Sequence, residues 1–421
     1  MKKILMALMV LFVIVGCQSK QSSIENAFFS DGLLAVELDG KWGYINNKGK
    51  FIIPALYDKA GAFYEGEAIV NVGGKAQLIN KDGKFVLDDY VDVLYRDDET
   101  KQLIYRKNGR SGLMSASGKV LSEALFDSLS PFSDGYAIIK AGTKYGYINT
   151  SGKIVISITY DHAKAFSNGL AAVKQTNNWG YIDKSNKTII TFDYSSAGSF
   201  DSFGNAIVQT TVDNVTKYHL ITKKQVSILS DADMIRGNGP VYSMKKGSDY
   251  TLHKTDGSRF NTQVYTNVWY IDAYESNLEL GGEDLNVMFK TDGTVMHSAL
   301  YNDSNFQGLL KDNQEIMALV VEDGSFIDVK MMDETLRLEA DDIIQILKKE
   351  KYVVFRSNKV GVINGDNEIV VEFLYDFMML FGDGYIAFVL NNKIGFMDSA
   401  FKTIIPATYD DICPEYNIFT I

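Results

Sequence analysis

Short runs in which every second residue is apolar recur along most of the chain, with polar breaks between them. Three such runs lie close together in residues 40–72, at Lys41–Ile45, Phe51–Ile53 and Gly66–Val70. Alternation with a period of two, bounded by glycine, asparagine and proline, is typical of β-strands that bury one face. We therefore predict a strand at each of these runs.

The breaks between these runs indicate how the strands are connected. Residues 46–49 have the length of a hairpin loop, and Gly49 suits the left-handed backbone position that closes such loops. Pro54 ends the second run, because proline cannot donate a hydrogen bond into a sheet. One unit is thus predicted to be a three-stranded antiparallel meander, followed by an irregular connector over residues 57–66. Gly43 lies within a strand, which predicts a bulge or a close approach of another backbone or a large ring.

This unit recurs about every 34 residues, and three markers keep the same register. The closing position of the hairpin loop falls at Gly49, Gly83, Gly118, Gly152, Asn186, Gly257, Gly293, Asn367 and Phe401, with Gln225 and Gly324 as weaker matches. A connector aspartate follows at Asp58, Asp92, Asp127, Asp161, Asp376 and Asp410. A Phe-x-(Asp/Asn/Glu)-Gly phrase occurs at 29–32, 63–66, 132–135, 166–169 and 381–384. Together the markers predict about eleven tandem units.

The phrases KWGYIN, KYGYIN and NWGYID, two of them followed by segments such as GKFIIPALYD, resemble the WG (or KWG) repeat that occurs in tandem in many bacterial proteins. The resemblance covers roughly residues 28–421, although the second unit has Ala76-Gln77 in place of Trp-Gly and residues 205–350 contain no such pair. It implies β-rich tandem repeats, often in surface or secreted proteins, without a general enzymatic activity or catalytic residues. The repeat positions that carry it are Trp42, Gly43, Tyr145, Gly146, Trp179, Gly180, Gly361 and Gly395.

The predicted fold class is all-β, and tandem units of this length favour propeller-like packing of small meander blades. Because typical propellers hold about four to eight blades, one ring, two rings and an open β-superhelix all stay open. Regular repeats are expected over 28–204 and 356–421, with divergent repeats over 205–355. The final run, 417–421, resembles a first strand that pairs with the N-terminal unit and closes a ring.

Residues 337–351 allow two interpretations. Ile343, Ile344 and Leu347 would share one face of a short amphipathic helix. Alternatively, Asp341 takes the place of a connector aspartate and Tyr352–Phe355 forms a first strand. The local pattern does not decide between them.

Residues 1–17 are typical of a signal peptide. Two lysines precede an apolar run over residues 4–15, which is too short for a permanent transmembrane helix. The ending Val15-Gly16-Cys17 resembles a bacterial lipobox and implies lipid attachment at Cys17; the alternative is an ordinary signal peptide with a chance cysteine. Residues 18–27 are then a tether. We expect a lipid-anchored protein of the cell envelope, and Gln18 is compatible with the outer membrane if the host has two membranes.

The charge and cysteine content of the chain bear on its partners and on what stabilises it. A formal net charge of −11 argues against nucleic acid and anionic lipid headgroups, which reward clustered lysine and arginine. The chain has two cysteines, so a lipidated Cys17 would leave Cys413 without a disulfide partner. Stability must then come from burial between stacked units.

No recognisable catalytic or metal-binding motif occurs in the sequence. Neither Gly-x-Ser-x-Gly, a Walker loop nor Cys-x-x-Cys is present. The loop aspartates are expected to cap their own backbone, because a calcium ion needs about six to eight oxygens. We therefore predict no enzyme, no cofactor and no metal. The histidines, expected in surface loops, are His162, His219, His253 and His297; the loop aspartates are Asp82, Asp183, Asp256, Asp292 and Asp398.

Aromatic residues give the remaining candidate surface. Trp42, Tyr145 and Trp179 share one repeat position, and a tyrosine follows each two residues later, on the same strand face (Tyr44, Tyr147 and Tyr181). They form either a core wedge between neighbouring units or a ladder of stacking platforms for sugar rings. The wedge is favoured because one unit cannot bury its apolar face alone. The expected function is a non-enzymatic scaffold that binds an envelope protein or glycan; the alternatives are a purely structural envelope component and, less favoured, an envelope hydrolase.

Overall fold

The computed structural model describes residues 29–413 with several gaps, and for the strands between residues 270 and 347 it describes the backbone alone. The gaps are residues 238–240, 261, 263, 266–269, 275–276, 283–284, 291–294, 298–305, 313–314, 324–325, 331–334, 341, 348–350 and 381–383. Cys17, the tether, Gly293, Gly324, Asp341, Phe381 and residues 417–421 therefore lie outside the described residues.

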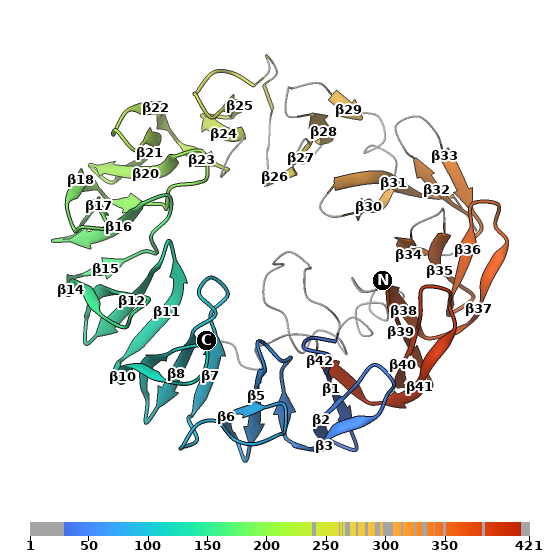
Figure 1. The fold of residues 1–421 in the computed structure, drawn as a ribbon. Helices are drawn as coiled ribbons and strands as arrows, with labels where there is room; N and C mark the ends of the chain where they lie inside the picture. The colour runs from blue at the N-terminus through green and yellow to red at the C-terminus, as the bar shows by residue number, and fades with distance from the viewer. Residues whose placement is uncertain are drawn as a thin grey trace.

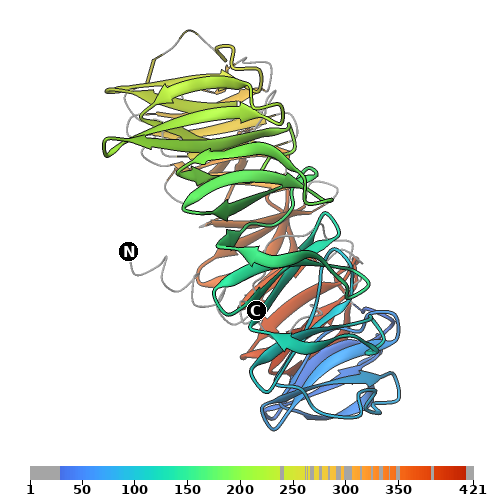
Figure 2. The same ribbon diagram turned by 90° about the vertical axis from the view of Figure 1, so that its left-hand side faces the viewer.

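Every regular element in the described part of the chain is a β-strand, which confirms the all-β prediction. The strands form eleven small antiparallel sheets that follow one another around a central axis (Figure 1). Seen from the side, the sheets lie in one band (Figure 2). Within the described residues there is no helix long and apolar enough to cross a membrane.

The sheets are numbered here in chain order. The first five consist of β1 (Leu34–Leu38), β2 (Lys41–Ile45), β3 (Phe51–Tyr57) and β42 (Asp411–Cys413); β4 (Lys59–Ala60), β5 (Glu67–Val72) and β6 (Lys75–Asn80); β7 (Val93–Arg96), β8 (Leu103–Lys107), β9 (Arg110–Met114) and β10 (Val120–Phe126); β11 (Ser128–Ser133), β12 (Tyr136–Ala141), β13 (Lys144–Asn149) and β14 (Ile154–Tyr160); and β15 (His162–Ala163), β16 (Leu170–Gln175), β17 (Asn178–Asp183) and β18 (Thr188–Tyr194).

The other six sheets consist of β19 (Ser196–Ala197), β20 (Asn205–Val212), β21 (Val215–Thr222) and β22 (Ser227–Ala232); β23 (Met234–Arg236), β24 (Val241–Lys246) and β25 (Asp249–Lys254); β26 (Tyr270–Tyr274), β27 (Asn277–Gly282), β28 (Leu285–Lys290) and β29 (Val295–His297); β30 (Phe306–Asp312), β31 (Glu315–Asp323), β32 (Phe326–Lys330) and β33 (Thr335–Leu338); β34 (Asp342–Leu347), β35 (Lys351–Arg356), β36 (Lys359–Asn364) and β37 (Ile369–Tyr375); and β38 (Phe377–Leu380), β39 (Ile386–Leu390), β40 (Lys393–Met397) and β41 (Thr403–Tyr409).

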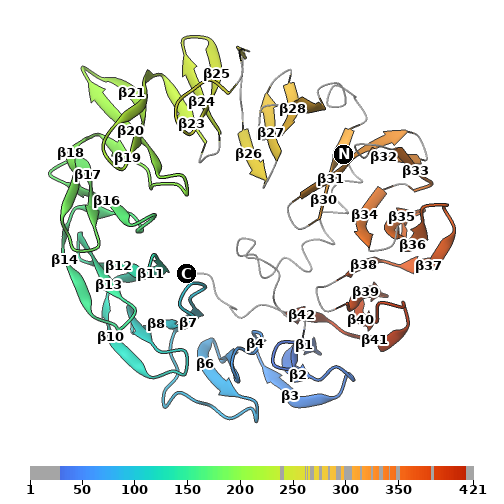
Figure 3. The same cartoon turned by 45° about the horizontal axis from the view of Figure 1, so that its top comes forward.

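Most sheets have four strands, whereas the sequence predicted a three-stranded meander and an irregular connector. The extra strand is the connector itself: in the fifth sheet, His162 and Ala163 pair with Lys174 and Val173 of β16. This pairing satisfies backbone groups that an irregular segment would leave open. In the fourth sheet the first strand, β11, lies on the inside of the ring and the last strand, β14, on the outside (Figure 3).

The predicted hairpin loops are confirmed wherever the structure describes them. In the first loop Gly49 has a φ of 74° and donates its N–H to the Asn46 carbonyl oxygen at 2.9 Å. Even the non-glycine residues at this position adopt the left-handed conformation, which costs a branched or bulky side chain energy. The positions with positive φ are Gly49, Gly83, Gly118, Gly152, Asn186, Gln225, Gly257, Asn367 and Phe401.

The predicted close approach at Gly43 is also present. A Cβ atom there would lie 2.6 Å from the Ala55 nitrogen, and the register between β2 and β3 shifts at this point. Gly146, Gly180, Gly361 and Gly395 meet the outer strand of their own sheets in the same way. Glycine at this repeat position thus lets the outer strand bulge over the middle strand.

The hydrophobic core lies between neighbouring sheets. In one cluster Tyr147 and Ile156 of the fourth sheet pack against Phe166 and Val173 of the fifth. Tyr147 is fully buried, and its hydroxyl donates to the Lys164 carbonyl oxygen at 2.7 Å. Each sheet therefore buries one face against the preceding unit and the other against the next unit, as in other repeat proteins.

The two ends of the array meet in one sheet, where β42 pairs antiparallel with β1 (Figure 1). Ile412 packs in the same cluster as Val36, and the Tyr409 hydroxyl donates to the Gly49 carbonyl oxygen at 3.0 Å. Of the arrangements that the sequence left open, strand pairing thus gives one ring. The pairing uses residues 411–413, upstream of the segment expected to make it.

The helical interpretation of residues 337–351 is wrong. Residues 342–347 form β34, which pairs with β35 over residues 351–356. A strand pairing with its neighbour here overrides the local helical spacing of the three apolar residues.

Candidate functional site

The connector aspartates tie each unit to the next along one rim of the ring, which we call the connector rim. Asp161 accepts a hydrogen bond from the Lys144 ammonium group at 2.6 Å and another from the Thr176 backbone N–H at 2.9 Å. Lys144 belongs to the fourth sheet and Thr176 to the fifth. The hydrogen bond from Lys144 is the main cause that lowers the pKa of Asp161. The repeated aspartate therefore links neighbouring units through one side-chain and one backbone hydrogen bond.

The same arrangement occurs at Asp233, which the sequence analysis missed. Asp233 accepts hydrogen bonds from Lys217 and from the Gly247 backbone N–H. It lies eight rather than nine residues after the closing position of its hairpin loop, Gln225. A search that allowed one deletion would have found it.

The repeat aromatics lie at this connector rim. Trp42, Tyr145 and Trp179 are partly buried and pack against the clusters between sheets, whereas Tyr44, Tyr147 and Tyr181 two residues later are fully buried. The two aromatic positions thus differ in burial. The tyrosine is the core wedge between neighbouring sheets, and the residue before the glycine packs at the edge of that core.

Two further aromatics take this place in the divergent repeats. Tyr218 lies opposite Gln209 and Tyr250 opposite Lys245, as Trp179 lies opposite Lys174. The sequence analysis missed them because His219 and Thr251 follow them where glycine was expected.

Three rings form a row across two adjacent sheets. The exposed imidazole of His162 stacks on Tyr145, with centroids 4.9 Å apart and an interplanar angle of 25°. Its centroid lies 5.3 Å from that of Trp179. We call Tyr145, His162 and Trp179 the aromatic row.

Lysines accompany the aromatic row. The Lys140 nitrogen lies 5.5 Å from the Tyr145 centroid, and the Lys164 nitrogen lies 5.5 Å from that of Trp179. Burial lowers the pKa of Lys164. Such an arrangement provides aromatic edges and cationic groups for contact with a partner.

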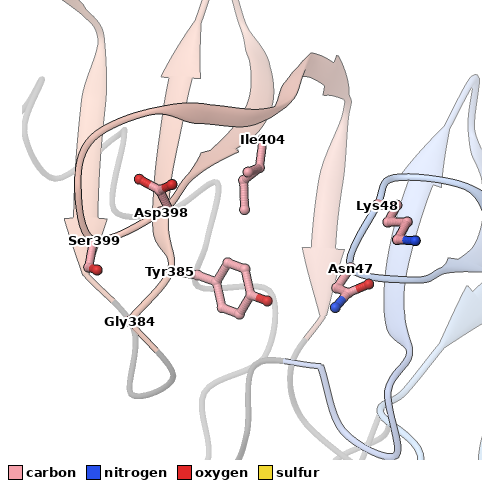
Figure 4. A pocket seen from close by; sticks show the side chains of 7 residues that line it. All are labelled: Asn47, Lys48, Gly384, Tyr385, Asp398, Ser399 and Ile404. Atoms are coloured by element: carbon pink, nitrogen blue, oxygen red, sulfur yellow. The ribbon is translucent and has the colours of Figure 1, made fainter.

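A pocket of about 410 Å³ lies at the opposite rim, where the last unit meets the first (Figure 4). The Asp398 carboxylate in its lining takes part in its own turn, where it accepts hydrogen bonds from the backbone N–H groups of Ala400 and Lys402. The residues that line it are Asn47, Lys48, Gly384, Tyr385, Asp398, Ser399 and Ile404.

The described loop aspartates take part in their own turns. Asp183 accepts hydrogen bonds from the backbone N–H groups of Ser185 and Lys187, both at 2.9 Å. Asp256 accepts one from Ser258, whereas Asp82 donates its own N–H to Asn80. Across the described part of the chain no group of three or more His, Cys, Asp or Glu residues is placed to hold a metal ion. Asp292 lies outside it.

The prediction that the histidines lie in surface loops is wrong. All four lie in strands: β15, β21, β25 and β29. His253 is buried, with its ring nitrogens 2.8 Å from the Thr251 hydroxyl and 2.9 Å from the Gly257 carbonyl oxygen. Burial is the main cause that lowers its pKa. Among the histidines whose side chains the structure describes, His162 alone belongs to the aromatic row.

The sequence model of a family described as "WG containing repeat" matches six stretches of the chain, at residues 25–42, 42–75, 112–145, 145–179, 179–210 and 361–393. No curated protein sequence matches the chain.

Several solved structures are similar to this fold at low sequence identity. One is a crystal structure of a eukaryotic initiation factor, with 10% identity and a TM-score of 0.43, covering 92% of this chain and 100% of the other. Another is Hsv2 of Kluyvelomyces marxianus, with 11% identity and a TM-score of 0.30, covering 53% of this chain and 87% of the other. A third is the dihydro-heme d1 dehydrogenase NirN, with 11% identity and a TM-score of 0.30, covering 68% and 76%.

At these sequence identities and TM-scores, the similar structures indicate nothing about the activity or partners of this protein. Five of the six matched stretches begin at the Trp-Gly or Tyr-Gly pair, or at its glycine: Trp42, Gly112, Tyr145, Trp179 and Gly361. The matched stretches are similar to WG containing repeats.

Proposed function

We propose that this protein is a non-enzymatic scaffold of the cell envelope that binds a protein or glycan partner at the connector rim. The observation that supports binding is the aromatic row, because the exposed His162 ring lines up with partly buried rings of two successive units. Side chains that only filled a core would not need an exposed member in the stack. A purely structural envelope component is the alternative, and the repeated aspartate contacts between units are equally compatible with it.

Removing the exposed ring tests binding without opening the core. In affinity capture from envelope lysates and glycan fractions, the His162→Ala variant should lose the partner that the parent protein enriches. Ser196 takes the equivalent place on the next short strand, so Ser196→Ala is the matched control and should retain the partner. A stable parent protein that enriches nothing above background would favour the structural alternative. Equal capture by both variants would exclude the aromatic row.

We further propose that the protein reaches the envelope through a lipid on Cys17. The short apolar run and the Val-Gly-Cys ending support this proposal. The Cys17→Ser variant should accumulate as unprocessed or mislocalised precursor. Radiolabelled fatty acid should enter the parent protein only, and equal labelling of the variant would contradict the proposal.

A further inference from the structure

The pairing of β1 with β42 joins the two ends of the array, and we call it the seam. It places two carboxylates opposite each other. Asp411 on β42 pairs directly with Glu37 on β1, and both side chains are partly buried. Directly opposed side chains in an antiparallel pair have Cβ atoms about 4.5–5.5 Å apart, and like charges there are destabilising.

We compared the cross-strand pair at this position in the sheets that have a similar inner strand. Of these, the seam is the one that pairs two acids. In the other sheets compared, the equivalent cross-strand pair contains at most one acid. These pairs are Lys59–Asn71, Val93–Arg106, Ser128–Lys140, His162–Lys174, Ser196–Gln209, Met234–Lys245, Asp342–Phe355 and Phe377–Val389.

Lys59 on β4 of the next sheet is exposed and lies opposite Asn71 of β5. The described cations on the strands beside the acid pair are engaged elsewhere. Lys393 on β40 pairs with Asp410, and Lys41 on β2 pairs with Asp58. Strand β41 carries no charged residue. The Asp411 carboxylate accepts a hydrogen bond from the Ile412 backbone N–H next to it, at 2.8 Å. No ion pair therefore offsets the repulsion between Glu37 and Asp411 in this part of the structure.

We propose that this acid pair is a pH-responsive latch, which holds β42 against β1 more tightly in mildly acidic than in neutral surroundings. The physical cause is a proton that the partly buried Asp411 carboxylate, opposite Glu37, holds more readily when the strands are paired. This device is independent of the binding proposed above, because it depends only on the seam.

The direction follows from the titration of Asp411. Burial, with Glu37 adding to it, raises the pKa of Asp411 from 3.8 to about 6 in the closed ring. When β42 is released, the pKa returns to its ordinary value of about 3.9. Between these two values the closed ring binds a proton that the open ring does not, so closure strengthens as pH falls from about 7 to about 4. A shift of about two pKa units corresponds to a change of roughly 100-fold in the closing equilibrium.

Cys413 provides the probe, since it is buried at the seam opposite Ala35. In the full chain with Cys17→Ser, it is the single thiol, and its reaction with 4,4′-dithiodipyridine reports release of β42. The rate in the folded protein, divided by the rate in urea-unfolded protein at the same pH, cancels the titration of the thiol itself. Protection of Cys413 should be about tenfold greater at pH about 5 than at pH about 7.5, because pH 5 lies only about one unit below the pKa of Asp411 in the closed ring.

The Asp411→Asn variant should show equal protection at both pH values, and Asp366→Asn, in an exposed hairpin loop, should keep the parent's pH dependence. Glu37→Gln removes the repelling partner and should raise protection at neutral pH, which tests the latch even if Asp411→Asn does not fold. A parent protein with pH-independent protection would overturn the proposal. So would a pH dependence that survives in Asp411→Asn.

Discussion

Truncation of Tyr181 to alanine should destabilise the protein by about 3–5 kcal/mol, the usual effect of deleting a fully buried aromatic ring. Tyr181 is completely inaccessible to solvent, its ring centroid lies 4.8 Å from that of Phe200, and its hydroxyl donates to the Gly198 carbonyl oxygen at 2.7 Å. Both partners belong to the next unit, so the loss falls on the interface between two sheets. Because units stabilise only their neighbours, urea unfolding should become broader or biphasic rather than shift as one transition.

Two variants separate the contributions at this site. Tyr181→Phe keeps the ring and removes one hydrogen bond, so it should cost about 1 kcal/mol. Trp179→Ala removes a ring that is only partly buried and should cost about 1–3 kcal/mol. Urea unfolding of the three variants, followed by circular dichroism and tryptophan fluorescence where Trp179 remains, gives the order. If Trp179→Ala cost more than Tyr181→Ala, the assignment of Tyr181 as the wedge would be wrong.

The repeats of this fold can be predicted well from the sequence because the residues of each unit determine its strands and turns locally. The alternation in KWGYI, the loop position of Gly49 and the close approach at Gly43 are local properties of a strand or a turn. Their recurrence in one register made the tandem array visible. The structure bears out even Phe401 as a closing residue, at a φ of 62°.

Contacts between residues far apart in the sequence were harder to predict. Pairing between β1 and β42 joins residues more than 370 positions apart, and the first-strand pattern at residues 417–421 did not indicate that residues 411–413 make it. The short inner strand β15 was missed because two residues are too few to show a period. The aromatic row was missed as a site because His162 reaches Tyr145 from a different sheet. Spacing along one strand does not encode that contact.

Placing a charge in the returning strand should have the largest effect on the ring as a whole. Ile412 is 8% exposed and packs between Val36 of β1 and Ile394 of β40. The Ile412→Asp variant would bury an unpaired carboxylate and lose the apolar contact, which should cost about 3–5 kcal/mol. That cost falls on a short strand with three paired residues, so the ring should open at the seam while the other sheets keep their structure.

Release of the seam has a distinctive readout. Cys413 should become reactive toward thiol reagents in native buffer, and limited proteolysis should cleave near the C-terminus, while far-ultraviolet circular dichroism keeps most of its β signal. Leu56→Asp is the matched control, because Leu56 lies on β3 of the same sheet and is 65% exposed. A surface charge there should change stability by no more than about 0.5 kcal/mol and leave Cys413 protected. If Ile412→Asp left Cys413 as protected as in the parent, the ring would not depend on β42, because burial of Ile412 is what the substitution removes.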